Sequence, residues 1–144
     1  MKATHKGRRL RALLSVEIRR VVEDLLRRRD LLLHVWSKHR VRAPFLETTF
    51  SRYRSLPMTD LLALDTGEMR AVEAFYREID DLRFYLSYTE DMPQSLATIL
   101  DSSLARLVPL ATRALASLGQ DGVEDDAPPP PWERVESVFG GSEE

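Results

Sequence analysis

One stretch near the start of the chain constrains the fold more than any other. From about Arg9 to Arg40 the sequence has neither glycine nor proline, and its apolar residues recur in alternating steps of four and three. This spacing places them on one face of an α-helix. The width of the stripe predicts that this long helix packs into a bundle. Its members are Leu14, Ile18, Val21, Leu25, Leu32 and Val35, widened by Leu13, Val22, Leu26 and Leu33.

Three more helices are predicted further along the chain. Apolar residues at helical spacing indicate a short second helix over about 44–54, a third over about 65–89 and a fourth over about 91–119. Asp65 and Glu68 are three residues apart at the start of the third helix, as in a capping box. Short connections between helices favour antiparallel neighbours. We therefore expect an all-α, up-and-down helical bundle with a long first helix, a short second helix and two further long helices.

The composition divides the chain into three parts. Residues 1–8 are basic and are expected to be a flexible N-terminus, and residues 9–119 are expected to be the bundle domain. Residues 120–131 read QDGVEDDAPPPP and have too few apolar groups to fold on their own. Residues 120–144 are thus interpreted as a disordered acidic, Pro-rich linker followed by a short amphipathic segment.

That amphipathic segment is the first candidate site. Trp132, Val135, Val138 and Phe139 recur in three- and four-residue steps, as in short motifs that bind a groove on another protein. The same four residues can instead dock on their own bundle. The sequence leaves both alternatives open.

Charge is unevenly distributed along the chain. Residues 1–42 carry 13 Lys or Arg and 4 acids, whereas residues 120–144 carry 1 Arg and 8 acids. A basic face on the first helix could attract phosphate, which makes nucleic-acid binding the main alternative function. The competing interpretation is a solvated face with ion pairs inside the helix. The candidate basic face consists of Arg19, Arg20, Arg27 and Arg28.

Six residues of the first helix carry a possible catalytic pattern. Residues 29–34 read RDLLLH, which resembles the Arg, polar, any three, His pattern of the HEPN ribonucleases, themselves small helical bundles. The resemblance covers six of 144 residues. It implies that Arg29 stabilises phosphate charge and that His34 acts as acid or base. The competing interpretation is that His34 and His39 lie near a helix end, where a positive charge is favourable.

Several classes of site are excluded or disfavoured by residue type. The chain has no Cys and only three His, so disulfides and thiolate metal sites are excluded and neither a metal nor a cofactor is expected. Tyr76, Tyr85 and Tyr88 are expected in the core. Asp80 and Asp81 are expected to pair with arginines of their own helix or to face water. No stretch approaches a membrane span or a secretory signal, which favours a cytoplasmic location.

These observations predict a non-catalytic protein–protein interaction module, such as an adaptor, a chaperone-like protein or a regulatory protein. The motifs in the sequence do not together provide a complete set of catalytic residues, which is the main reason for this prediction. The expected partner is another protein, with a homodimer possible because the first helix is longer than the others. Nucleic-acid binding and the HEPN-like ribonuclease remain alternatives. The sequence does not identify the partner, the process or the oligomeric state.

Overall fold

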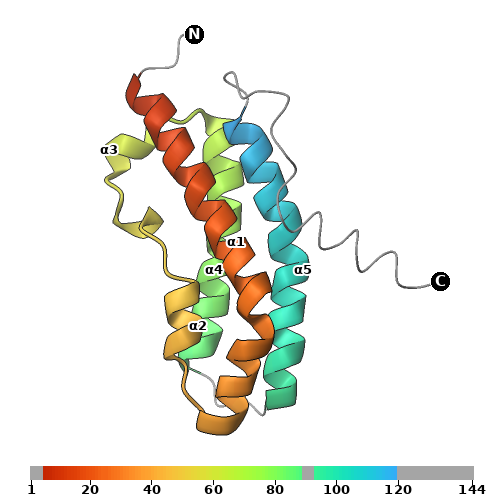
Figure 1. The fold of residues 1–144 in the computed structure, drawn as a ribbon. Helices are drawn as coiled ribbons and strands as arrows, with labels where there is room; N and C mark the ends of the chain where they lie inside the picture. The colour runs from red at the N-terminus through yellow and green to blue at the C-terminus, as the bar shows by residue number, and fades with distance from the viewer. Residues whose placement is uncertain (1–4, 89–92, 120–144) are drawn as a thin grey trace, which may run out of the picture.

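The chain forms a bundle of helices in a computed structural model, which describes residues 5–88 and 93–119 (Figure 1). Three helices are long and the elements between the first two of them are short. In chain order the elements are α1 (His5–His39), α2 (Ala43–Thr48), the 3₁₀ helix η1 (Tyr53–Ser55), α3 (Met58–Leu61), α4 (Thr66–Tyr88) and α5 (Pro93–Leu118).

The elements run alternately up and down the bundle (Figure 1). α1 and α4 run in one direction, and α5 returns in the other. The second leg of the bundle is broken into α2, η1 and α3, which together climb from the end of α1 to the start of α4. α5 packs against both α1 and α4, and α2 joins α1 and α4 on the opposite side. This architecture confirms the predicted all-α bundle with a long first helix, a short second helix and two further long helices.

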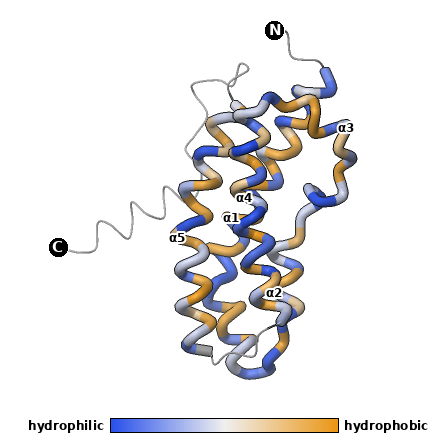
Figure 2. Tube along the Cα trace, turned by 180° about the vertical axis from the view of Figure 1, so that it is seen from behind, coloured by the Kyte–Doolittle hydropathy of each residue, from blue (hydrophilic) through white to orange (hydrophobic). Residues whose placement is uncertain are grey.

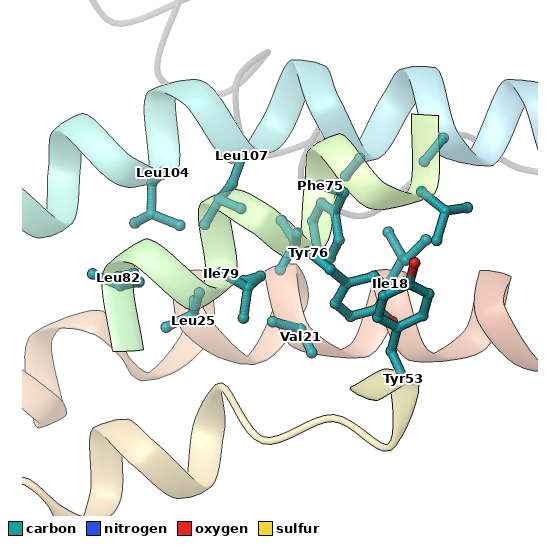
Figure 3. Packing of buried hydrophobic residues seen from close by; sticks show 14 of the residues in the cluster. Ile18, Val21, Leu25, Tyr53, Phe75, Tyr76, Ile79, Leu82, Leu104 and Leu107 are labelled. Carbon is teal, nitrogen blue, oxygen red and sulfur yellow. The ribbon is translucent and has the colours of Figure 1, made fainter. Parts of the chain in front are cut away.

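The core lies where the apolar faces of the three long helices meet (Figure 3). Most of the stripe predicted for the first helix is buried, and it faces apolar residues of α4 and α5. Each fully buried aliphatic or aromatic side chain contributes about 1.5–3 kcal/mol relative to its exposed state. At the edges of the stripe the prediction differs from the structure, because Leu13 is exposed and Trp36 is buried beside the half-buried Val35.

α1 is buried along one face from Leu10 to Trp36, so none of its stripe protrudes beyond the bundle. It begins at His5, four residues before the expected start at Arg9. It ends at His39, and the next residue, Arg40, has a φ of 54° and an amide that donates to the Trp36 carbonyl at 3.0 Å. A left-handed residue commonly ends a helix in this way, although the position usually holds glycine.

α2 ends earlier than the sequence predicts. The Thr48 hydroxyl donates to the Pro44 carbonyl at 2.8 Å, and the Thr49 hydroxyl donates to the Phe45 carbonyl at 2.9 Å. Arg83 of α4 donates to the Thr49 hydroxyl at 2.9 Å and holds this turn against α4. Such hydroxyl bonds compete with the continuation of a helix. The predicted helix over 44–54 is therefore wrong beyond Thr48.

α4 begins at the predicted capping box. The Glu68 amide donates to Asp65 Oδ1 at 2.8 Å, and the Asp65 amide donates to Glu68 Oε1 at 3.0 Å. The same carboxylate is 4% exposed and accepts two bonds from Arg11 of α1, at 2.6 and 2.9 Å. This buried pair joins the first part of α1 to the first turn of α4.

Two expectations for α4 are corrected by the structure. Tyr88 is 76% exposed rather than in the core, because it lies on the outward face of the helix beside Phe84. Asp80 pairs with Arg54 from η1 rather than with an arginine of α4. Tyr76 is buried and Tyr85 is half-buried, as expected. None of the described helices is long and apolar enough to cross a membrane.

Candidate interaction groove

The upper half of the second leg is not one continuous helix but the short elements η1 and α3 with connecting segments (Figure 1). We call residues 51–64, which contain η1 and α3, the strap. The hydropathy view shows apolar residues concentrated around α3 (Figure 2). A full helix at this place would cover the neighbouring faces of α1 and α4. The strap instead borders two hollows, one between it and α1 and one between it and α4.

Tyr53 anchors the strap to α4 (Figure 3). Its ring stacks on Tyr76 with centroids 4.1 Å apart and an interplanar angle of 4°. Its hydroxyl donates to Glu73 Oε2 at 2.7 Å. Burial raises the pKa of the Tyr53 phenol, and the hydrogen bond to the Glu73 carboxylate raises it further. The phenol therefore serves as a hydrogen-bond donor that fixes the strap.

Ion pairs hold the rest of the strap in place. Arg54 Nε donates to Asp80 at 2.7 Å, and Arg54 Nη1 lies 3.2 Å from both carboxylate oxygens of Glu73. At the other end, Lys6 Nζ of α1 lies 2.6 Å from Asp60. The strap is thus attached to α4 and α1 at separate points, with α3 between them.

A groove of about 660 Å³ lies between α3 and the outer face of α4. Its volume falls within the range of roughly 300–1,000 Å³ that is typical of ligand-binding pockets. Tyr53 lines it, and Thr66 lies at its edge where α4 begins. The apolar wall consists of Met58, Leu61, Leu62, Leu64, Met69 and Ala74. The groove is therefore shaped to receive apolar side chains.

Two apolar side chains project from the wall of this groove into solvent. Met58 is 79% exposed and Leu62 is 69% exposed. α3 follows Pro57 and has no side-chain cap. Because it has only four residues, it is too short to bury both of its faces. Methionine is flexible and adapts to irregular surfaces. This lip can adjust to an apolar partner.

Two cations stand on the α4 side of the groove. Arg70 and Arg77 both line it and are exposed. They are seven residues apart, which places them on one side of α4 at a separation of about 10.5 Å. Neither makes an ion pair with another residue in the described ranges 5–88 and 93–119. Glu73 lies between them but is bound to Tyr53 and Arg54.

The outer face of α4 continues from the groove to an exposed aromatic pair. Phe84 follows Arg77 by seven residues, so the two share a face of the helix. Phe84 and Tyr88 are exposed, and their ring centroids are 4.8 Å apart. Aromatic residues and arginine dominate the energetics of protein–protein interfaces. We call the groove together with this pair the α4 surface.

The ribonuclease-like residues are not arranged around a cleft in the described structure. Arg29 donates from Nε and Nη2 to the two carboxylate oxygens of Asp101 on α5, at 2.6 and 2.8 Å. The hydrogen bond from Arg29 lowers the pKa of Asp101. His34 is exposed, five residues along the helix and therefore on a different side. Arg29 thus joins α1 to α5 rather than meeting His34 in a shared site.

The candidate basic face is largely engaged in internal contacts. Arg20 bonds to Glu17 and to the Phe50 carbonyl, at 3.1 and 2.7 Å. Arg27 bonds to Asp24 at 2.8 Å. These contacts match the competing interpretation of a solvated face with ion pairs.

Arg28 and Arg19 complete the basic face. Arg28 donates to the Thr48 hydroxyl at 3.3 Å and so contacts α2. Arg19 is half-buried and has no ion pair within the described part of the chain. The four residues therefore do not form one set of free cations.

Neither the remaining candidate residues nor similarity to known proteins points to a further site. Trp132, Val135, Val138 and Phe139 lie outside the described residues. Within residues 5–88 and 93–119, no three His, Asp or Glu side chains are grouped as a metal ion would require. No family model, no curated protein and no solved structure matches the chain.

The groove itself was missed by the sequence reasoning, although a signal for it exists. Met58, Leu61, Leu62 and Leu64 fall within seven residues, between Pro57 and the capping box. That segment is too short for a helix that could bury apolar residues on all sides. A dense apolar cluster in such a short segment indicates exposed apolar surface.

Proposed function

We propose that this protein is a non-catalytic protein–protein interaction module whose α4 surface docks an amphipathic helical segment of a partner protein. The observation that carries the proposal is the apolar groove between α3 and α4, with Met58 and Leu62 projecting beside it. Exposed apolar surface bordered by polar groups marks interaction sites on proteins. We keep the cytoplasm as the proposed location.

The shape of the groove favours a helix as the docking element. It is elongated along α4, because its lining residues on that helix extend from Thr66 to Arg77 in steps of three and four. A partner helix can place side chains at positions i, i+3, i+4 and i+7 into such a groove. The cations Arg70 and Arg77 favour a partner whose polar face is acidic.

The expected affinity is modest. Full burial of a large apolar side chain contributes about 1.5–3 kcal/mol. The wall and the aromatic pair offer four exposed side chains of this kind, Met58, Leu62, Phe84 and Tyr88. These four side chains offer about 6–12 kcal/mol in all, and the loss of translational and rotational freedom offsets at least roughly 4 kcal/mol of it. A net gain of at most about 8 kcal/mol corresponds to a dissociation constant no tighter than about micromolar, as in a regulatory or adaptor contact.

The alternative functions receive less support from the geometry. Arg29 is held by Asp101, so the HEPN-like arrangement would first require that this ion pair be broken. Arg20, Arg27 and Arg28 each have a partner within the bundle, which reduces the free charge available to a nucleic acid.

A capture experiment with charge substitutions tests the proposal. The groove variant Met58→Glu/Leu62→Glu places carboxylates on the apolar lip. The matched control Val16→Glu/Leu31→Glu makes the same change at two exposed apolar residues of α1. All four sites are exposed, so both variants should fold, which circular dichroism checks.

Affinity capture from a lysate of the source organism, followed by binding of the purified partner, gives the result. We expect a partner that is retained by wild type and by the control and lost from the groove variant. Partners that bind both variants equally would refute the groove as the docking surface. A parallel capture with a chain ending at Gly119 tests the predicted role of Trp132 and Phe139, and identical partners would remove that role.

A further inference from the structure

The C-terminal residues have an apolar and acidic pattern that is complementary to the apolar and basic groove. Residues 132–139 read WERVESVF, in which apolar residues at three- and four-residue spacing alternate with Glu133 and Glu136. The groove presents an apolar wall with Arg70 and Arg77 on its α4 side. We infer that residues 132–139 bind the α3/α4 groove of their own chain. This inference rests on the proposed role of the groove as a docking surface, and it names the occupant.

The position at which α5 ends makes this contact reachable. Helix α5 ends at the end of the bundle where α4 begins and where α3 lies, as the front and rear views both show (Figures 1 and 2). α5 also packs directly against α4. The groove opens on the outer face of α4, so the chain needs to pass around only one helix.

The connecting residues are long enough for that path. Residues 119–131 separate α5 from Trp132, and four of them are consecutive prolines. At about 3.1 Å per residue for an extended Pro-rich chain, thirteen residues reach roughly 40 Å. Packed helices lie about 8–10 Å apart, so passing around α4 requires roughly 20 Å. The connection can span this distance without being fully extended.

Charge favours the same occupant. Residues 120–144 carry eight acids and one Arg, whereas Arg70 and Arg77 have no ion-pair partner among the described residues. Opposite charges on the two surfaces favour their encounter and disfavour a basic segment in the same groove. Arg11 and Arg54, which also lie beside or within the strap, are already paired.

The covalent connection favours the chain's own tail over that of a second copy. A connection that can reach the groove holds the segment at an effective concentration in roughly the millimolar range. A second copy reaches such a concentration only in very concentrated solutions. A partner protein must therefore displace residues 132–139, which makes the tail a competitor that limits access to the groove.

Disulfide trapping tests this contact, because the natural chain has no Cys. The full-length double variant Leu62→Cys/Val135→Cys places one thiol on the lip and one on the tail segment. The control Val16→Cys/Val135→Cys places the first thiol at an equally exposed residue of α1, which also packs against α5. Alkylation rates of the single variants correct for differences in thiol reactivity.

We expect the groove pair to form an intramolecular disulfide at least about ten times faster than the control pair in dilute solution. Mass spectrometry under non-reducing conditions distinguishes this product from a dimer. Equal rates for the two pairs would overturn the inference, since they would reflect tethering alone. Formation of dimers only would overturn it as well, because the occupant would then be a second copy.

A second measurement tests whether trapping depends on the apolar contact of the tail segment rather than on thiol placement alone. Trp132→Ala in the Leu62→Cys/Val135→Cys background removes the largest apolar side chain of the segment and should slow trapping severalfold. An unchanged rate would overturn the inference. Failure of both measurements would leave the proposed function standing, because that function is tested separately by the Met58→Glu/Leu62→Glu capture.

Discussion

The buried pair between Arg11 and Glu68 should be among the most sensitive points of the fold. Glu68 accepts two bonds from Arg11 and also caps α4 through the Asp65 amide. Glu68→Ala would leave the Arg11 guanidinium, whose side chain is 12% exposed, without its carboxylate. Removal of one partner of a buried ion pair costs about 3–5 kcal/mol. We therefore expect Glu68→Ala to lower the free energy of unfolding by about 3–5 kcal/mol.

A double variant separates the net stabilisation that the ion pair provides from the destabilisation caused by leaving one charge buried without its partner. Arg11→Met/Glu68→Met replaces both charges with flexible apolar side chains of similar length. Because neither charge remains buried and unpaired, this change should cost less than about 2 kcal/mol, most of it from the lost cap. Arg27→Ala is the matched control, since Arg27 forms an exposed pair with Asp24 that is worth less than about 1 kcal/mol.

Urea unfolding followed by far-ultraviolet circular dichroism measures all of these changes. We expect the double variant to be more stable than Glu68→Ala alone. If Glu68→Ala cost no more than Arg27→Ala, the pair would contribute nothing to the fold. The single variants Arg11→Met and Glu68→Met complete a double-mutant cycle. If their costs simply added in the double variant, the two side chains would not be coupled, and the account would be refuted.

Three further predictions concern titratable side chains. Because the hydrogen bond from Arg29 lowers the folded pKa of Asp101 below 3.8, the stability from this exposed pair is present above about pH 4 and is lost as pH falls through the folded pKa. Asp101→Asn should thus cost up to about 1 kcal/mol in urea unfolding at neutral pH and nothing near pH 2, and an equal cost at both would contradict this. Burial raises the pKa of Tyr76 to about 12 from 10.0, so its contribution to stability should fall between pH 10 and 12. Tyr76→Phe should flatten that fall, and an unchanged slope would exclude Tyr76 as its source. Wild type and His34→Ala should give equal RNA cleavage, and lower cleavage by the variant would restore the ribonuclease hypothesis.

The parts of the fold that depend on local patterns could be predicted from the sequence. The apolar stripe of α1 defines one buried face over most of its length, because helical periodicity is a local property. The start of α4 follows from Asp65 and Glu68, whose reciprocal bonds need only three residues of separation. Helix α5 likewise begins at Pro93, close to the expected start at about residue 91.

The parts that depend on long-range contacts could not be predicted. Glu68 was expected to cap α4, but its second partner, Arg11, is 57 residues away in the sequence. The end of α2 at Thr48 depends on the contact of Arg83 with Thr49, which only the packed bundle provides. Tyr53 was assigned to a helix, but its stacking on Tyr76 instead fixes the strap.

The candidate site likewise has features that a local pattern predicts and features that depend on long-range contacts. The sequence indicated protein contact and pointed to Trp132 and Phe139, which lie outside the described residues. The groove was not predicted because its two walls come from separate segments, residues 58–64 and 66–77. The apolar cluster in residues 58–64 indicates exposed apolar surface, but the groove itself depends on how the broken second leg packs against α4.

Binding of a captured partner to the groove is the most direct test of the account. Met58 and Met69 line the groove, so ¹³C-labelled methionine methyl groups report on its occupancy in nuclear magnetic resonance spectra. Titration with the purified partner should shift both signals, and Leu62→Glu should weaken binding at least about tenfold while Val16→Glu leaves it unchanged. Binding of equal affinity to both variants, with the two methyl signals unmoved, would show that the partner docks elsewhere.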